Sequence, residues 1–328
     1  MESYLASERI QLITNLKDVV GRTCDGRRPM NVVFIGSPAC GKSSFINSFS
    51  ASIADDYWRE YAFSGGQGVG RGVANQITVR LKRFKPTEYV TSKRLQGYAL
   101  PTLIDISGLH EGEGGLTEEI LRLLFYGQLK ENTNIMSVYK YGKERGLQKM
   151  RAKYWRWFTN NSDKVDRVIV VASATEPIPQ GLINSVMKAA RPTGDKYTRE
   201  IPVFGMLTKF DQVDESSDEF KNRKATLFTA LSLVGVSHRI GQCVNYCDTI
   251  DPDLTRTKQT LPDVDIPILR FMNVVCGSQY EVINPEESYR SIYFHEAAWD
   301  LLTGMVTPVM CLVLCFFISC AIAMLLVK

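Results

Sequence analysis

The chain has 328 residues and a formal net charge of +4, which is enough length for one large domain or two ordinary ones. Hydrophobic residues make up 45% of it and charged residues 23%, close to the averages of globular proteins. This composition excludes an intrinsically disordered chain and a collagen. Eight cysteines in this length are too few for a disulfide scaffold, so we expect free thiols in a reducing compartment.

Apolar patterning predicts strands that alternate with helices. Residues 3–20 have helical spacing of apolar positions, and we expect an amphipathic helix packed against the main domain. Short apolar runs predict strands at 31–35, 99–106, 166–172, 201–207 and 240–246, and alternating apolar and polar residues predict a half-exposed strand at 77–84. Helical patterns lie between them at 43–54, 118–129, 180–190, 219–233 and 266–275. This alternation predicts an α/β fold, with a mostly parallel sheet covered by helices on both faces.

Residues 130–158 depart from this alternation. They hold eight Lys or Arg against two Glu, together with five Tyr or Trp. A basic segment with aromatic residues can bind phosphate backbones or an anionic membrane surface. The alternative, which we favour, is a helical insertion whose charges are solvated and whose aromatic rings pack on the core.

A long uncharged segment lies near the C-terminus. Residues 301–327 contain no charged residue, and a helix over 308–327 would span about 30 Å, the thickness of a bilayer core. Trp299 lies where interfacial aromatic residues usually lie. The alternative is a buried core helix, although such helices are usually shorter and carry polar residues. We expect a transmembrane helix that is inserted after synthesis and leaves the N-terminal domain in the cytosol. We expect it in the endoplasmic reticulum rather than the mitochondrial outer membrane.

A phosphate-binding pattern, G-x-x-x-x-G-K-S/T, lies between the first predicted strand and the next predicted helix. Its residues are Gly36, Ser37, Pro38, Ala39, Cys40, Gly41, Lys42 and Ser43. The two glycines let backbone N–H groups wrap around phosphate oxygens. Lys42 is expected to reach the β- and γ-phosphates and Ser43 to ligate Mg²⁺, with Ser44 next in the helix. The alternative is a glycine-rich turn without a ligand, which the position between strand and helix disfavours.

A D-x-x-G pattern ends the predicted strand 99–106, at Asp105 and Gly108. In nucleotide switches such an Asp binds Mg²⁺, usually through water, and the Gly amide meets the γ-phosphate. The pattern is weak on its own and gains weight from its place after the phosphate-binding loop.

An N/T-K-x-D pattern follows the predicted strand 201–207, at Thr208, Lys209 and Asp211. A carboxylate at Asp211 can accept hydrogen bonds from both N1–H and the exocyclic amine of guanine, and adenine has neither donor in that arrangement. Alone, the pattern could be a charged turn after a strand. In order with the other two motifs, it predicts a guanine site.

Together the three motifs resemble a Ras-like P-loop GTPase domain. Residues 31–276 further resemble the interferon-induced protein 44 family, through the stretches GSPACGKSSFINS, LPTLIDISGLHEGEGGL, YGQLK, TKFD and CVNYCDTIDPD. The resemblance implies a GTPase-like fold that binds GTP or GDP with Mg²⁺, and a link to innate immune responses. It also implies that Asn245 and Tyr246 belong to the last guanine-contacting loop. A hydrophobic tail is not expected in this family.

The predicted catalytic residues are less complete than the binding residues. Many GTPases have a Gln directly after D-x-x-G to orient the attacking water, and here that residue is Leu109. His110 could position water instead, or simply be a solvent-exposed histidine. Arg71, in the glycine-rich loop 64–73, could act as an arginine finger in cis or be a plain loop residue. Thr78 is the candidate switch threonine and Mg²⁺ ligand, with Ser64 as its alternative.

These observations predict a domain organisation and a function. We expect a helix and basic turn at 1–29, a GTPase domain at 30–277, a linker at 278–300 and a transmembrane tail at 301–328. The predicted function is a membrane-anchored slow GTPase, acting as a switch or assembly factor and forming a nucleotide-dependent homodimer. The alternative is a GTP-stabilised scaffold that hydrolyses little and recruits partners. A P-loop kinase is disfavoured by Asp211, and nucleic acid is not an expected partner.

Overall fold

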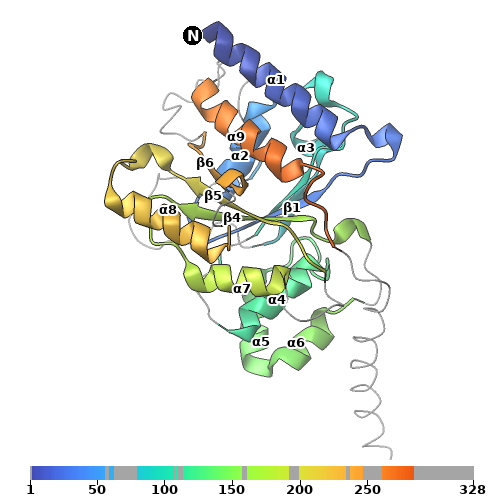
Figure 1. The fold of residues 1–328 in the computed structure, drawn as a ribbon. Helices are drawn as coiled ribbons and strands as arrows, with labels where there is room; N and C mark the ends of the chain where they lie inside the picture. Colours follow the sequence, from blue (N-terminus) through green and yellow to red (C-terminus); the bar gives the residue numbers. More distant parts are fainter. Residues whose placement is uncertain are drawn as a thin grey trace, which may run out of the picture. The chain divides into compact units, whose positions relative to one another are not determined.

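Six strands of the described residues form one sheet in the computed structural model, in the order β2-β3-β1-β4-β5-β6 (Figure 1). The parallel strands are β1 (Asn31–Ile35), β3 (Thr102–Asp105), β4 (Arg167–Ser173), β5 (Val203–Thr208) and β6 (Ile240–Gln242). The edge strand β2 (Lys82–Phe84) runs antiparallel to β3. This confirms the predicted α/β class and the mostly parallel sheet.

The structure describes residues 2–55, 59–62, 80–106, 108–109, 114–156, 161–191, 199–233, 237–246 and 261–283. Apart from Arg199, these residues belong to one compact unit, Met1–Thr193 with Glu200–Ile283.

Helices cover both faces of the sheet (Figure 1). One face carries α1 (Glu2–Val20), α2 (Lys42–Ser52), α3 (Pro86–Tyr89) and α9 (Pro262–Cys276). The opposite face carries α4 (Gly115–Phe125), α5 (Ile135–Arg145), α6 (Leu147–Tyr154), α7 (Gln180–Ala190) and α8 (Asp218–Ala230). Short 3₁₀ turns lie in the connections, at Thr23–Asp25, Lys93–Leu95, Asn161–Asp163, Phe210–Gln212 and Ser237–Arg239.

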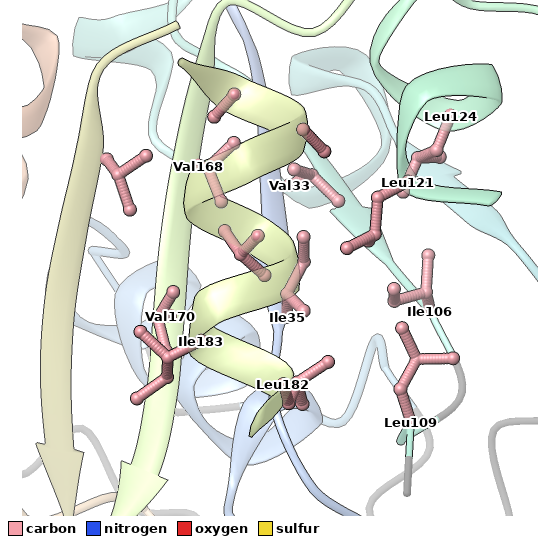
Figure 2. Close-up of a cluster of buried hydrophobic side chains, with 14 of the residues drawn as sticks. Val33, Ile35, Ile106, Leu109, Leu121, Leu124, Val168, Val170, Leu182 and Ile183 are labelled. Carbon is pink, nitrogen blue, oxygen red and sulfur yellow. The ribbon is translucent and has the colours of Figure 1, made fainter. Parts of the chain in front are cut away.

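The central strands are buried on both sides because their side chains alternate between two apolar clusters. Val33 and Ile35 of β1 join one cluster, whereas Val32 and Phe34 join the other. Figure 2 shows the first cluster, in which the β1 and β4 side chains face those of α4 and α7. Fully burying each such side chain contributes about 1.5–3 kcal/mol. The continuous apolar runs of the sequence therefore predicted these strands well.

The first helix packs on the main domain, as its amphipathic pattern predicted. Leu16 is fully buried, and Asn273 of α9 donates from Nδ2 to the carbonyl of Leu12 at 3.0 Å. Arg9 Nε lies 2.8 Å from Asp265 Oδ2, also on α9. Apolar burial and this ion pair together dock α1 along α9.

Several predicted boundaries move. The strand expected at 77–84 is described only as β2 over Lys82–Phe84, and the last strand, expected at 240–246, ends at Gln242. The insertion at 130–158 forms α5 and α6, and its aromatic residues pack partly buried against the first cluster, at Tyr139, Tyr141, Tyr154 and Trp155. These contacts favour the packing interpretation of that segment.

In the part of the chain that the structure describes, no helix is long and apolar enough to cross a membrane. The predicted transmembrane segment at 301–327 lies outside the described residues. Four cysteines within the described ranges are free thiols, as expected, at Cys24, Cys40, Cys243 and Cys276.

Candidate functional site

The loop from Gly36 to Ser43 connects β1 to α2 and depends on its two glycines. A Cβ on Gly36 would lie 2.1 Å from the carbonyl oxygen of Val171, which no side chain tolerates. Gly41 precedes the first residue of α2 with φ +95°, in the left-handed region that favours glycine, and Ala39 also has positive φ, +58°. The loop is thus compact, and it leads directly into the N-terminus of α2, the positive end of the helix dipole, which suits an anion.

Lys42 carries a buried positive charge into this loop. Its side chain is only 6% exposed, and Nζ donates to the carbonyl oxygens of Ser37 at 2.8 Å and Gly36 at 3.2 Å. A cation held among backbone carbonyls lies where phosphate charge needs compensation. Ser44, one residue on, has its carbonyl oxygen 2.7 Å from the Ser48 hydroxyl and helps to build α2.

Ser43 and Asp105 are in direct contact although they lie far apart in the sequence. The Ser43 hydroxyl donates to Asp105 Oδ2 at 2.7 Å, and Asp105 is 2% exposed at the end of β3. Strands β1 and β3 are parallel neighbours, so the residues after each lie at the same edge of the sheet. Hydroxyl and carboxylate oxygens are the ligands that Mg²⁺ prefers, so this pair fits the ion.

Gly108 lies directly against the phosphate-binding loop. A Cβ on this residue would be 2.3 Å from the Pro38 nitrogen and 2.5 Å from its Cα. The next amide, of Leu109, donates to the Gly36 carbonyl at 3.2 Å. The D-x-x-G segment therefore closes one side of the loop, and only glycine allows this approach.

The Leu109 side chain is buried and apolar, so it cannot position a water molecule for attack. It is 5% exposed and belongs to the same apolar cluster as Ile106 (Figure 2). The residue that would be Gln in many GTPases is thus part of the core.

The third motif is connected to the loop by a hydrogen bond. Thr208 Oγ1, fully buried at the end of β5, donates to the Cys40 carbonyl at 2.6 Å. Lys209 follows in a left-handed conformation, and its Nζ lies 3.6 Å from Glu176 Oε1. Asp211 is exposed, so its carboxylate is accessible to a ligand.

Asn245 also lies beside the loop. Its Nδ2 would be 3.2 Å from a Cβ placed on Gly41, and its Oδ1 accepts from Cys243 Sγ at 3.6 Å. The residue is 9% exposed. Its predicted place in the last loop of the site fits this position.

The Tyr246 side chain is buried behind the last loop of the candidate site. Its side chain is 5% exposed, and the hydroxyl donates to Asp265 Oδ1 at 3.0 Å. Burial raises the pKa of the Tyr246 hydroxyl and so keeps it protonated. The ring therefore packs in the second apolar cluster. Its backbone amide, which donates to Ser48 Oγ at 2.8 Å, holds the last loop against α2.

Three supporting residues were missed in the sequence, namely Ser48, Arg9 and Asp265. Burial raises the pKa of the Asp265 carboxyl, and the charge of Arg9 opposes that rise. Each contact joins residues that are distant in the chain, and no short motif signals it.

The two thiols at the site are not nucleophiles. Burial raises the pKa of Cys40, and it likewise raises the pKa of Cys243. A thiol that stays protonated is inert, so no covalent chemistry is expected of either residue.

The predicted catalytic residues lie outside the described residues. Arg71, Thr78 and Ser64 fall in 63–79, and His110 falls in 110–113. Their roles remain predictions.

No protein-family model and no curated protein matches the chain. Among solved structures, it is similar to a probable GTP-binding protein engB, with 12% identity over 69% of this chain and 95% of that one, at a TM-score of 0.30. It is also similar to a dimerization-deficient mutant of Toc33 from Arabidopsis thaliana, with 13% identity over 86% of this chain and 95% of that one, at a TM-score of 0.43.

Proposed function

We propose that this protein binds guanine nucleotides together with Mg²⁺, at the loops that follow β1, β3, β5 and β6. The main support for this proposal is the hydrogen bond from Ser43 to Asp105, which lies beside Gly108 and the phosphate-binding loop. The hydrogen bond from Thr208 to Cys40 brings the guanine motif to the same edge. Ligands of open α/β sheets bind at this carboxyl edge of the strands.

Each part of the nucleotide has residues that suit it. The backbone amides of the loop and Lys42 suit the phosphates, and Ser43 with Asp105 would hold Mg²⁺, which supplies positive charge to the phosphates when bound. Exposed Asp211 suits the donor edge of guanine, and Asn245 would support the base from the neighbouring loop.

We propose that hydrolysis is slow, because Leu109 is buried and cannot orient a water molecule. His110, Arg71 and Thr78 stay the candidate residues for the reaction, on sequence grounds. The same observation supports a second candidate function, a GTP-stabilised scaffold that hydrolyses little. Single-turnover hydrolysis at low and high protein concentration separates the two, since a dimerising GTPase turns over faster when concentrated and a scaffold does not.

Membrane anchoring is part of the proposal and rests on the sequence. Residues 301–327 lack any charge, and such a segment is stable in a bilayer core. We place the GTPase domain in the cytosol, where GTP and Mg²⁺ are found, and favour the endoplasmic reticulum. Membership of the interferon-induced protein 44 family and an immune role are likewise proposed, from the motif resemblance alone.

Calorimetric titration of the protein with GTP, GDP and ATP in the presence of Mg²⁺ tests the central proposal. We expect binding of GTP and GDP but not ATP. Lys42→Ala and Ser43→Asn should each weaken GTP binding, whereas Lys188→Ala, an exposed lysine on α7, should not. Equal GTP binding by all three variants would refute a phosphate-binding role for this loop.

A further inference from the structure

A pocket lies at the opposite end of the sheet from the proposed nucleotide site. It has a volume of about 700 Å³ and is lined in part by Asn31 and Thr102, the first residues of β1 and β3. The phosphate-binding loop instead follows the last residue of β1. A strand of this length spans about 16 Å, so the two sites are separate.

Arg83 forms part of the wall of this pocket. It lies on β2, is 9% exposed, and its Nη1 and Nη2 are buried without a hydrogen-bond partner among the described residues. Asp163, the acidic residue in the lining, pairs instead with Arg156 at 3.6 Å. A guanidinium stays charged in proteins, and one buried without hydrogen bonds is destabilising. Among the described residues, nothing accepts a hydrogen bond from this guanidinium, so an anion bound in the pocket would supply the acceptor.

The rest of the lining combines neutral polar residues with two further cations and some apolar residues. Arg28 and Lys85 also line the pocket, and the guanidinium of Arg28 is held by two bonds to Asp166, at 2.8 and 3.0 Å. Apolar surface comes from Pro86, Val90 and Leu95. An arginine guanidinium can bind a phosphate group through two parallel hydrogen bonds. The volume of this pocket lies within the range of about 300–1,000 Å³ that is usual for small-molecule sites.

We propose that this pocket binds a phosphate monoester that carries an apolar group, with Arg83 as the residue that binds the phosphate. The ligand is either a soluble phosphorylated molecule or the headgroup of a phospholipid. The guanidinium nitrogens are covered, so binding includes a rotamer change of Arg83, of a kind common at interfaces.

The test is calorimetric titration of the full chain, saturated with Mg²⁺ and GDP, with phenyl phosphate. Arg83→Met keeps the length of the side chain and should bind about tenfold more weakly or worse, because charge-assisted hydrogen bonds are lost. Arg94→Met, an exposed arginine outside the lining, is the matched control and should bind as the parent does. No binding by the parent, or equal binding by Arg83→Met, overturns the proposal.

Lys42→Ala separates this pocket from the phosphate-binding loop. It should leave phenyl phosphate binding unchanged even if the chain binds no guanine nucleotide. Loss of binding in Lys42→Ala would assign the phosphate to the loop and overturn the second site.

Thermal unfolding distinguishes ligand binding from a structural role for Arg83. Phenyl phosphate should raise the Tm of the parent and not of Arg83→Met, which without ligand should unfold at the same or a higher temperature. A lower Tm for the variant, together with no ligand effect on the parent, overturns the proposal.

Glycerol 3-phosphate and dihexanoyl phosphatidic acid, used as a soluble monomer, identify the source of the phosphate. Each should compete with phenyl phosphate. Tighter binding of the lipid supports a membrane headgroup, and equal binding supports a soluble molecule. Failure of both to compete would refute a phosphate monoester site.

Discussion

Tyr246 and Asp265 connect the last loop of the proposed nucleotide site to helix α9. The tyrosine hydroxyl donates to Asp265 Oδ1 at 3.0 Å, and Arg9 of α1 reaches the other carboxylate oxygen at 2.8 Å. The same hydroxyl accepts from the Leu261 amide at 3.2 Å. The N-terminal helix therefore shares one buried polar network with a loop of the site.

Removing the cation of this network should destabilise the fold. Arg9→Met leaves the buried Asp265 carboxylate without its ion-pair partner, and we expect the free energy of unfolding to fall by about 3 kcal/mol. Urea unfolding followed by circular dichroism measures it. Gln11→Ala, on the exposed side of the same helix, is the control and should unfold like the parent. Equal stability of Arg9→Met would mean that α1 is held by apolar contacts alone.

A methyl group on Gly108 should weaken the binding of GTP, because this residue is proposed to contact the γ-phosphate. Gly108→Ala places Cβ within 2.3 Å of the Pro38 nitrogen, so the D-x-x-G segment must move away from the loop. We expect GTP to bind about tenfold more weakly, with a smaller change for GDP. In Gly115→Ala the new Cβ meets only Leu147 Cδ1, at 3.7 Å, so that variant serves as the control in the same titrations. Parent-like GTP affinity of Gly108→Ala would argue against the proposed γ-phosphate contact.

The base specificity should follow Asp211. Asp211→Asn loses a charged acceptor, so GTP affinity should fall about a hundredfold. Affinity for xanthosine triphosphate should rise relative to GTP, because the amide can donate to the oxo group that replaces the guanine amine. Competition titrations measure both, with Glu215→Gln, an exposed neighbour, as control. An unchanged preference for GTP would mean that the base is read elsewhere, for example by Asn245.

The described thiols should differ in reactivity. Burial raises the pKa of Cys276 to about 12 and also raises the pKa of Cys40, so near neutral pH both stay protonated and covered. Cys24 is exposed. Alkylation of the native protein with iodoacetamide, followed by peptide mass spectrometry, should label Cys24 first. Rapid labelling of Cys40 in the folded protein would contradict the packed loop.

The tail should anchor the chain in membranes. After expression in cells, alkaline carbonate extraction should leave the parent in the membrane pellet. Leu312→Arg combined with Phe316→Arg should move it to the supernatant, because each charge at mid-span costs about 2.5–3.5 kcal/mol. Recovery of the parent in the supernatant would return residues 301–327 to the core-helix alternative.

Much of the fold could be predicted from the sequence because its signals are local. The apolar run at 31–35 and the helix pattern at 180–190 match β1 and α7 residue for residue. β1 is buried within the sheet and α7 packs one apolar face on it, so the apolar residues of both segments match their buried positions. The three motifs were also expected in neighbouring loops, and the structure brings those loops into contact.

Boundaries that depend on neighbours were less predictable. The last strand ends at Gln242, although the Cys243 amide still donates to the Leu207 carbonyl of β5 at 2.9 Å, and by Tyr246 the backbone bonds to Ser48 of α2 instead. A run of apolar and polar residues cannot show where a strand loses its pairing partner.

The sequence by itself determined the chemistry proposed for the site, since Lys42, Ser43, Asp105 and Asp211 are recognisable from short motifs. Only the tertiary structure decided which neighbours serve that site. It turned Tyr246 into the core and buried Leu109, and it left the guanidinium of Arg83 in a pocket wall without a hydrogen-bond partner among the described residues. The physical reason is distance along the chain. A motif is read within a few residues, whereas burial and hydrogen bonding depend on segments that meet only when the sheet and its covering helices are assembled.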